Sequence, residues 1–467
     1  MHLLPTTRHE IGLLWRARPG MAGLLLAGQG LARLPGPAIR KVPGIGWVTG
    51  DPVVAREVLK DHRSFTMVGE GGVGDLWAQI LGEWVRDLFD GPGHHDLRTR
   101  ARDLFTERTA GALVAGTWGP TLRDAGERLA AGEPVDVAHT SRVLVGRMMI
   151  ELLGIPAPDG PQSGRPGDAV APGAGPDAPP WGDGVVVPSG AAPSGPVRSW
   201  PDDDGALAAF RTGERLAKLA LGTEGSTTLP PEKIAEAKLI TDELTAGVPY
   251  AFRTAPPSRL LGRARELGLT LEEATGLASL LMVAGTETSA SAMMRTTALL
   301  ADTGEQHRLL AALGAQESRP GAAGSPAGAA PGPHPPSDGP WDAVVREGLR
   351  VTSPASVIGR GVSADVEIGG ARLRTGDRIM LLVWSANAAA GPFRIDREYV
   401  RETRQLWFGA GRHLCLGAAL AKAEVAALLR TLWTTPDGAP AGPLRVVRRE
   451  ASREVIVPGY EKLVVSR

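Results

Sequence analysis

The sequence has a single cysteine, Cys415, among its 467 residues. One cysteine excludes an intramolecular disulfide and every zinc or iron–sulfur site that needs several cysteines, and it is typical of a reducing compartment. Three roles stay open for a lone cysteine: an inert buried side chain, a nucleophile or a metal ligand. The residues around this sulfur must decide among them.

The sequence also lacks net charge and long hydrophobic runs. Its 51 basic residues balance 51 acidic ones, which indicates neither nucleic acid nor an anionic membrane as a partner. The most apolar stretch near the start, residues 21–28, is far shorter than the roughly 20 residues of a spanning helix. Arg16, Arg18 and Pro19 precede this stretch and do not suit a signal peptide. We therefore expect a cytoplasmic protein without a membrane anchor.

The chain is long enough for a large core, with 43% hydrophobic residues. Length alone suggests two or three domains, although large single-domain enzymes reach the same size. Residues 156–201 and 318–340 are rich in proline, glycine and alanine, a composition that buries too little apolar surface to fold. We expect one domain over residues 1–467 with these two segments as disordered insertions, a domain boundary being the alternative for each.

Helical patterns dominate the rest of the sequence. Thr270 and Glu273 have the spacing of a capping box, and a largely apolar run without proline follows over residues 277–300. A helix of about 30 residues here would cross most of a domain. A second helix begins after Gly417, and a third covers residues 341–350. The buried stripe of the second helix comprises Val425, Leu428, Leu429 and Leu432.

Strand signals are fewer and short. They consist of β-type runs separated by glycine-containing turns. These runs cover residues 46–49, 356–362, 366–368, 378–383 and 454–457. The sequence therefore predicts a mainly α protein with small β-sheets (α+β).

The most informative segment surrounds the cysteine. Gly409 and Gly411 allow tight turns and a close approach of the backbone to a flat ligand. Cys415 then stands just before the second helix, where free amide groups and the helix dipole favour a thiolate. As a nucleophile it would need His413 as base, but a residue two positions away in a tight loop is poorly placed. As a haem ligand, the thiolate promotes cleavage of dioxygen, and the residues alone favour this second role moderately.

The whole loop resembles the haem-binding signature of the cytochrome P450 family. The matching positions are Phe408, Gly409, Gly411, His413, Cys415 and Gly417. The resemblance implies haem b, ligated by Cys415, in the fold of that family. It also implies that the haem lies between the long oxygen-activating helix and the helix that follows the cysteine loop.

A second motif lies midway along the long helix, at Ala284, Gly285, Glu287 and Thr288. Read without context, small residues here form a packing notch that weakens the helix by up to about 1 kcal/mol per position. The motif is similar to the family's acid–threonine pair. The resemblance implies that the notch leaves room for dioxygen over the haem, that Thr288 hydrogen-bonds dioxygen and that Glu287 joins a proton relay.

Glu347 and Arg350 stand at i,i+3 in the third helix, a spacing that is usually solvated and worth only about 0.2–0.5 kcal/mol. The resemblance implies instead a buried ion pair completed by a second arginine. Arg397 is the best candidate for that arginine, with Arg401 and Arg404 as alternatives. Breaking such a cluster strands a buried charge.

Haem propionates need cationic partners. Four residues resemble the family's, and surface bases without a ligand are the alternative for each. They are His94 (or His95 in its place), Arg98, Arg360 and His413.

The substrate pocket is expected to be apolar and fairly bulky. By resemblance, the loop over residues 68–89 lies above the haem and supplies part of the wall. The expected lining residues are Trp77, Trp84, Leu88, Leu281 and Val357.

The resemblance implies monooxygenation with O2 as co-substrate. The chain has no room for a flavin or nicotinamide domain, so a ferredoxin and an NAD(P)H-dependent ferredoxin reductase are expected as partners of a monomer. A basic docking face is expected from Arg98, Arg100, Arg102, Arg412 and Lys422.

Two other classes of function compete with this prediction. A haem-bearing binding module without turnover is one, and the presence of Thr288 argues against it. A cysteine hydrolase is the other, and it requires that no haem binds to Cys415. The alanine-, glycine-, proline- and arginine-rich composition resembles proteins of high-GC bacteria, where many relatives act in natural-product metabolism.

Overall fold

The computed structural model describes residues 7–31, 35–69, 73–154, 203–221, 228–317, 339–398 and 400–467. The two proline-rich segments expected to be disordered, residues 156–201 and 318–340, lie outside these ranges except for the last two residues of the second. Of those two, Gly339 caps a helix that begins at Pro340.

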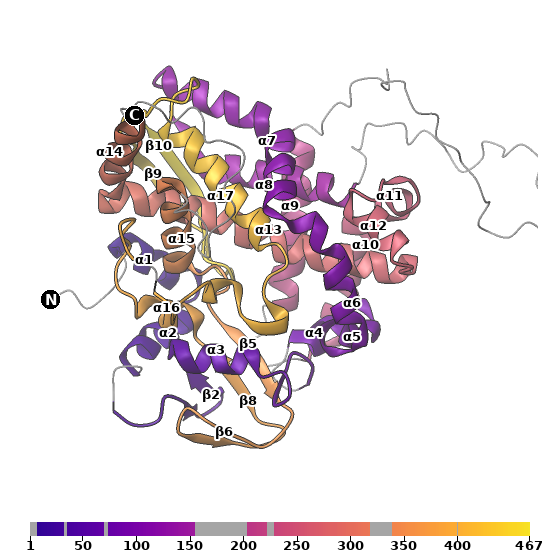
Figure 1. Cartoon of the computed structure of the whole chain (residues 1–467). Coiled ribbons are helices and arrows are strands. Elements are labelled where there is room, and N and C mark those ends of the chain that lie inside the picture. The colour runs from indigo at the N-terminus through magenta and orange to yellow at the C-terminus, as the bar shows by residue number, and fades with distance from the viewer. Residues whose placement is uncertain are drawn as a thin grey trace, which may run out of the picture.

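Most of the described chain is helical, as the sequence predicts (Figure 1). The N-terminal helices are Arg8–Ala17 (α1), Pro19–Leu31 (α2), Pro52–Lys60 (α3), Val73–Leu81 (α4), Trp84–Asp90 (α5), Pro92–Ala101 (α6), Glu107–Ala130 (α7) and Val137–Leu153 (α8). The following helices are Asp203–Leu221 (α9), Pro231–Thr245 (α10), Val248–Thr254 (α11), Leu260–Glu266 (α12), Leu271–Thr303 (α13), Glu305–Glu317 (α14), Pro340–Thr352 (α15), Val383–Ala388 (α16) and Ala418–Trp433 (α17). Short 3₁₀ turns cover Arg102–Phe105 (η1), Leu406–Phe408 (η2) and Gly411–His413 (η3).

The predicted long helix is α13, and it begins with the predicted capping box. The Thr270 hydroxyl accepts a hydrogen bond from the Glu273 N–H at 3.2 Å, and the Glu273 carboxylate accepts one from the Thr270 N–H at 2.7 Å. This reciprocal capping box satisfies two amide groups that have no partner inside the helix. The helix ends at Gly304, whose φ of 74° stops the right-handed turn.

The other two predicted helices are also confirmed. α17 begins directly after Gly417, and the four residues of its predicted stripe are completely buried. α15 extends two residues beyond the prediction, to Thr352, and ends before Ser353 and Pro354.

The strands form small sheets, with one of them below the helices in Figure 1. A five-stranded sheet has the order β1-β2-β8-β5-β3, a three-stranded sheet the order β4-β10-β9, and a hairpin pairs β6 with β7. Their bounds are Arg40–Val42 (β1), Gly46–Thr49 (β2), Phe65–Thr66 (β3), Val135–Asp136 (β4), Ile358–Val362 (β5), Val366–Ile368 (β6), Ala371–Leu373 (β7), Arg378–Leu381 (β8), Arg445–Ala451 (β9) and Tyr460–Ser466 (β10).

Two strand predictions need correction. Residues 454–457 form no strand but the connection between β9 and β10, where Glu454 has a φ of 56°. The two real strands flank the connection and were missed because charged residues interrupt their apolar pattern, as in Arg448, Arg449 and Glu450 of β9. The segment over residues 68–89, expected as a loop, forms α4 and α5 in its described part.

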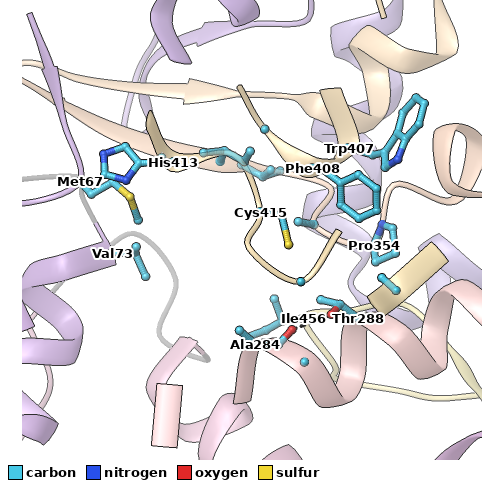
Figure 2. Close-up of a pocket in the computed structure, with 18 of the residues that line it drawn as sticks. Met67, Val73, Ala284, Thr288, Pro354, Trp407, Phe408, His413, Cys415 and Ile456 are labelled. Carbon is cyan, nitrogen blue, oxygen red and sulfur yellow. Dashed lines mark hydrogen bonds between the residues drawn. The ribbon is translucent and has the colours of Figure 1, made fainter. Parts of the chain in front are cut away.

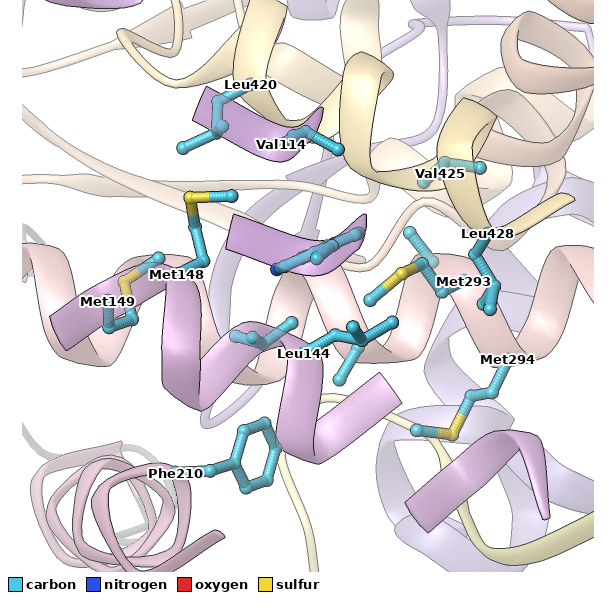
Figure 3. Close-up of a cluster of buried hydrophobic side chains, with 14 of the residues drawn as sticks. Val114, Leu144, Met148, Met149, Phe210, Met293, Met294, Leu420, Val425 and Leu428 are labelled. Carbon is cyan, nitrogen blue, oxygen red and sulfur yellow. The ribbon is translucent and has the colours of Figure 1, made fainter. Parts of the chain in front are cut away.

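The core lies where α7, α8, α9, α13 and α17 meet. Figure 3 shows Leu144, Met148, Phe210, Met293 and Leu428 among the side chains that point toward one another from these helices. α13 passes between the others, so its side chains are buried on several faces over its second half. None of the described helices is both long and apolar enough to cross a bilayer.

The packing of α8 against α9 depends on a glycine. A Cβ at Gly146 would overlap the carbonyl oxygen of Ala206, which belongs to the backbone and cannot move away alone. We expect Gly146→Ala to destabilise the protein by about 1–3 kcal/mol through overpacking. Thermal unfolding followed by circular dichroism measures the effect.

Gly111→Ala is the matched control, because Gly111 stands on the exposed side of α7 and a Cβ there would meet no atom within 4 Å. This control should leave stability unchanged or raise it by up to about 1 kcal/mol, since alanine is the better helix former. Equal stability of both variants would contradict the close contact of α8 and α9.

Candidate functional site

A cavity of about 970 Å³ lies between α13 and the cysteine loop. Its wall also includes parts of α2, α4, β5, β8 and α17, and most of the lining side chains are apolar. Figure 2 shows the Cys415 sulfur pointing into this space, toward the part of α13 that carries Ala284 and Thr288. Segments that are far apart in the sequence therefore face one another across one cavity.

The cysteine loop is held by glycines and one backbone bond. Gly409 and Gly411 have φ values of 79° and 68°, which other residues rarely adopt. A Cβ at Gly411 would lie 2.6 Å from the carbonyl oxygen of Leu59, so only glycine fits against α3. The Cys415 N–H donates to the carbonyl oxygen of Phe408 at 2.9 Å and closes the loop. The sulfur is thereby presented immediately before α17.

The electrostatics of this sulfur favour a cationic neighbour. Cys415 is accessible, but its accessible surface faces the cavity deep in the protein. Burial raises the pKa of the Cys415 thiol, whereas the Gly417 N–H and the Arg98 charge act in the opposite direction. The thiol therefore keeps its proton in the protein alone, and a metal cation in the cavity would stabilise the thiolate.

A group of basic side chains surrounds the loop. Arg98 donates to the carbonyl oxygen of Leu414. The rings of His94 and His413 are 4.6 Å apart, and His94 Nε2 is 3.2 Å from the carbonyl oxygen of Arg412. His413 Nε2 is 3.1 Å from Asp90 Oδ1. Burial lowers the pKa of His413, and its hydrogen bond with Asp90 acts in the opposite direction.

Asp90 secures the other side of this group. Burial alone would raise the pKa of the Asp90 carboxyl, but hydrogen bonds from His413, Thr66 and Met67 bring it well below its usual range. The Met67 N–H donates to Asp90 Oδ2 at 2.6 Å. This carboxylate therefore ties the segment after β3 to the cysteine loop.

Among the basic residues, Arg360 gives the clearest indication of an anionic ligand. It lines the cavity from β5 and is 5% exposed. Burial lowers the pKa of its guanidinium to about 10, and the charge of Asp90 acts in the opposite direction. Its Nη1 donates to the carbonyl oxygen of Gly359 at 2.8 Å, and no described carboxylate lies within salt-bridge distance of it. A buried cation in an apolar cavity is costly unless an anionic ligand pairs with it.

These features fit haem b. Cys415, Arg360 and His413 line the same cavity. There the sulfur would bind iron, the two basic side chains would pair with propionates, and the apolar wall would suit a porphyrin. His94 and Arg98 lie beside the cysteine loop and do not line the cavity directly. The other expected cofactor contacts that the structure places in the cavity wall are Ala284, Gly285, Phe408, Gly409 and Gly417.

Thr288 and Glu287 point in different directions from α13. Thr288 lines the cavity, and its hydroxyl donates to the carbonyl oxygen of Ala284 at 2.6 Å. Glu287 does not line the cavity. Burial and the charge of Glu214 raise the pKa of Glu287 to about 8, whereas Lys218 and Arg142 act in the opposite direction. Its Oε1 has no hydrogen-bond partner among the described residues.

Only some of the residues expected to line the substrate pocket line the cavity in the structure. Leu281 and Val357 line the cavity, and the side chain of Leu88 lies outside the described residues. Trp77 packs in the core and Trp84 packs against Gly276 of α13, so neither lines the cavity.

The reason for this difference is helical phase. The segment is helical, so Val73 and Leu76 of α4, three residues apart, turn toward the cavity together. Trp77 follows on the adjacent face and joins the core.

The structure brings Glu347, Arg350 and Arg397 together. Arg350 donates to both carboxylate oxygens of Glu347 at 2.8 Å, and Arg397 Nε donates to Glu347 Oε2 at 3.2 Å. Arg350 also donates to the carbonyl oxygens of Asn387 and Gly391. The cluster therefore ties α15 to the segment that leads into the cysteine loop.

Glu424 of α17 is a lining residue that sequence reasoning missed. It is 1% exposed, and burial raises the pKa of its carboxyl to about 8, against a hydrogen bond from Ser289. Ser289 and Glu424 both line the cavity. The signal was present in the sequence, because Glu424 stands four residues before Leu428 and thus on the buried stripe.

Comparisons with known proteins agree with this geometry. A family model described as Cytochrome P450 matches residues 341–434. A curated protein described as putative cytochrome P450 140, from Mycobacterium bovis, is 39% identical over 107 residues, which cover 22% of this chain and 24% of that protein. The steroid C26-monooxygenase of Mycolicibacterium smegmatis is 35% identical over 142 residues, or 27% of this chain and 34% of that protein. The matched segments thus span only about a quarter to a third of these relatives.

Solved structures extend the likeness to the whole fold. P450BioI, in complex with acyl carrier protein ligated to hexadec-9Z-enoic acid, has a TM-score of 0.65 at 19% identity, covering 96% of this chain and 99% of that one. A mutant of P450 EryK in complex with erythromycin B has a TM-score of 0.64 at 20% identity, covering 96% of each chain.

The raised pKa of Glu424 predicts how stability depends on pH. The folded state holds this proton up to about pH 8, whereas the unfolded chain releases it near pH 4.3. The contribution of Glu424 is therefore complete below about pH 4 and is lost as the pH rises to about 8. We expect Glu424→Gln to melt at least about 2 °C above the parent at pH 8 and at nearly the same temperature at pH 5.

Calorimetry at both pH values measures this difference. The control is Glu57→Gln, which makes the same change at an exposed position of α3. A pH-independent effect of Glu424→Gln would show that the buried carboxyl does not hold its proton as inferred.

Proposed function

We propose that this chain, which belongs to the cytochrome P450 family, is a monooxygenase that inserts one oxygen atom of O2 into an apolar organic substrate. The observation that carries the proposal is the position of Cys415. Its sulfur faces Ala284 and Thr288 across a largely apolar cavity that also contains the buried cation of Arg360.

Haem b is the cofactor of this family. In this proposal Cys415 would bind the haem iron, and Arg360 and His413 would pair with the propionates, with His94 and Arg98 beside them. When bound, the haem supplies dioxygen activation and one-electron chemistry.

The chain itself supplies space, protons and exclusion of water. Ala284 and Gly285 carry little or no side chain, so the part of α13 opposite Cys415 leaves space in the cavity. A small diatomic molecule has room there, beside Thr288. The Thr288 hydroxyl donates to the carbonyl oxygen of Ala284, and its oxygen can still accept a hydrogen bond from a water beside it. It would have to give up the bond to Ala284 to donate to dioxygen. Glu287 holds a proton near neutral pH because its pKa is raised to about 8 and can replenish the proton that is consumed in the cavity.

Electrons are supplied by a ferredoxin and an NAD(P)H-dependent reductase. The support is a basic surface on the side of the cysteine loop, where Arg102 is exposed and Arg412 is half-buried. Lys422 is 4.0 Å from Glu107, which reduces its contribution to this surface. Arg98 donates to the loop, and the side chain of Arg100 lies outside the described residues.

The setting of the reaction follows from the cavity and from the relatives. Apolar lining side chains suit a substrate with a large hydrocarbon part. One structural neighbour, a mutant of P450 EryK, is in complex with erythromycin B. We therefore propose a monomeric cytoplasmic enzyme of bacterial natural-product metabolism.

Replacing the cysteine tests the ligand. The ferrous–CO complex of the parent should show the strongly red-shifted Soret band of a thiolate-ligated haem, and Cys415→Ser should lose this band, because a hydroxyl does not donate electron density as a thiolate does. Absorbance spectra of the purified proteins measure this band. An unchanged band in the variant would contradict the assignment of Cys415 as the iron ligand.

Replacing Thr288 tests the proton path. Thr288→Ala should keep haem content and substrate affinity, but NAD(P)H consumption should yield hydrogen peroxide in place of product, because the hydroxyl that directs protons is gone. The fraction of NAD(P)H used for product, measured with a ferredoxin system, should fall at least about tenfold, which is less than the roughly hundredfold or more that a positioned proton-transfer group contributes to a rate.

Thr286→Ala is the control for this experiment. Thr286 lies on the same helix, is fully buried and does not line the cavity, so its variant should stay coupled. A fully coupled Thr288→Ala enzyme would show that Thr288 only packs.

A further inference from the structure

A second pocket lies apart from the cavity that Cys415 lines. It has a volume of about 440 Å³, and residues of α1, β9 and β10 form its described wall. None of these residues lines the larger cavity. The proposed binding of haem and substrate therefore leaves this second pocket without a role.

The wall of the second pocket is basic. Arg8, His9 and Arg16 line it from α1, and Arg449 lines it from β9, whereas none of the described lining residues is acidic. Arg8 and Arg16 are eight residues apart, so they lie on the same face of α1, about 12 Å apart along the helix axis. The positive charges are therefore spread along the pocket.

Gly12 provides the space between these two arginines. It stands midway between them on α1 and lines the pocket. A Cβ at this position would meet no atom within 4 Å. A larger side chain there would extend into the pocket without overlapping a neighbouring residue, so the volume depends on the absence of a side chain.

Most of the positive charge in this wall is uncompensated. Arg8 and Arg16 are exposed, and no described carboxylate lies within salt-bridge distance of either. Arg449 is paired, since its Nη1 and Nη2 donate to Asp302 at 2.8 and 2.7 Å. Two guanidinium groups of the wall are thus available to an anion.

A buried hydroxyl also lacks an acceptor in this pocket. Tyr460 lines the pocket from β10 and is 2% exposed. Its hydroxyl lies near Arg449 but makes no hydrogen bond of normal geometry with the described residues. Burial and the charge of Glu10 raise the pKa of Tyr460, so the hydroxyl keeps its proton. A buried donor without an acceptor is costly, and an anion in the pocket would supply the acceptor.

Both sides of the pocket are fixed to the same helix. Arg295 of α13 donates to Glu10 of α1 through Nε at 2.9 Å. Asp302 of α13 accepts from Arg449 of β9. These two ion pairs hold α1 and β9 in place, so the pocket exists before any ligand enters it.

We propose that this pocket binds a small anion with two or more linked phosphate groups. A guanidinium matches phosphate oxygens with paired N–H donors. Phosphate oxygens can also accept hydrogen bonds from several directions, here from α1 on one side and from Tyr460 on the other. Linked phosphates can contact both Arg8 and Arg16, which are two helical turns apart. The bound anion connects α1 to the β9–β10 pair, and this role does not depend on the chemistry of the larger cavity.

Isothermal titration calorimetry of the haem-loaded protein tests the pocket directly. Pyrophosphate is compared with citrate, which has a similar charge but only carboxylates, and with inorganic phosphate, which has a single group. The ionic strength is held constant, because salt screens exposed charges. We expect pyrophosphate to bind at least about tenfold more tightly than either of the others, the difference of one further charge-assisted hydrogen bond.

Four variants separate the contributions of the wall. Arg8→Gln and Arg16→Gln should each weaken pyrophosphate binding about threefold, because exposed charges interact weakly. Tyr460→Phe should weaken it about tenfold, while the melting temperature of the ligand-free variant should not fall, since the hydroxyl has no partner to lose. Gly12→Leu should lose measurable binding because its side chain fills the pocket.

Arg211→Gln is the matched control, because Arg211 is exposed on α9 and does not line the pocket. It removes the same charge and should keep the full affinity for pyrophosphate. Absence of pyrophosphate binding by the parent, equal binding of citrate, or a loss in Arg211→Gln as large as in Arg8→Gln and Arg16→Gln would each overturn the proposal. Full affinity in both Gly12→Leu and Tyr460→Phe would overturn it as well.

Discussion

The structure is organised around one sulfur, deep in the protein at the wall of a cavity, that needs a positive charge beside it. Cys415 lies deep in the protein, and burial raises the pKa of its thiol more than the Gly417 N–H and Arg98 lower it. A protein fold alone does not stabilise a thiolate there, whereas an iron ion does. The glycines of the loop, the hydrogen bond to Phe408 and the start of α17 all serve to present this sulfur to the cavity.

Other buried ionisable groups also depend on a ligand in the cavity. Arg360 carries a cation into an apolar wall, and Glu287 and Glu424 keep protons because their pKa values are raised to about 8. Each is costly in an empty apolar interior and useful beside an anionic, redox-active ligand. By contrast, the Glu347 carboxylate is fully satisfied by Arg350 and Arg397, which suits a structural support for the cysteine loop.

Much of this arrangement could be predicted from the sequence, since local chemistry determined it. The capping box of Thr270 and Glu273 and the stripe of α17 depend on neighbours within a few residues. Features that depend on residues far away in the sequence were not predicted. The orientation of Trp77 follows from the helical phase of α4, and β9 and β10 are specified by their mutual pairing more than by their own patterns. Glu424 was visible on its stripe, but its burial depends on α13, whose Ser289 hydrogen-bonds to it.

The bond between Cys415 and iron is the central claim. X-ray absorption at the iron K-edge of the purified ferric protein measures the atoms bound to the metal without any assumption about substrate or redox partner. The account predicts four porphyrin nitrogens and one sulfur in the first coordination sphere. An iron surrounded only by nitrogen and oxygen atoms, in a protein whose cysteine is intact, would contradict it.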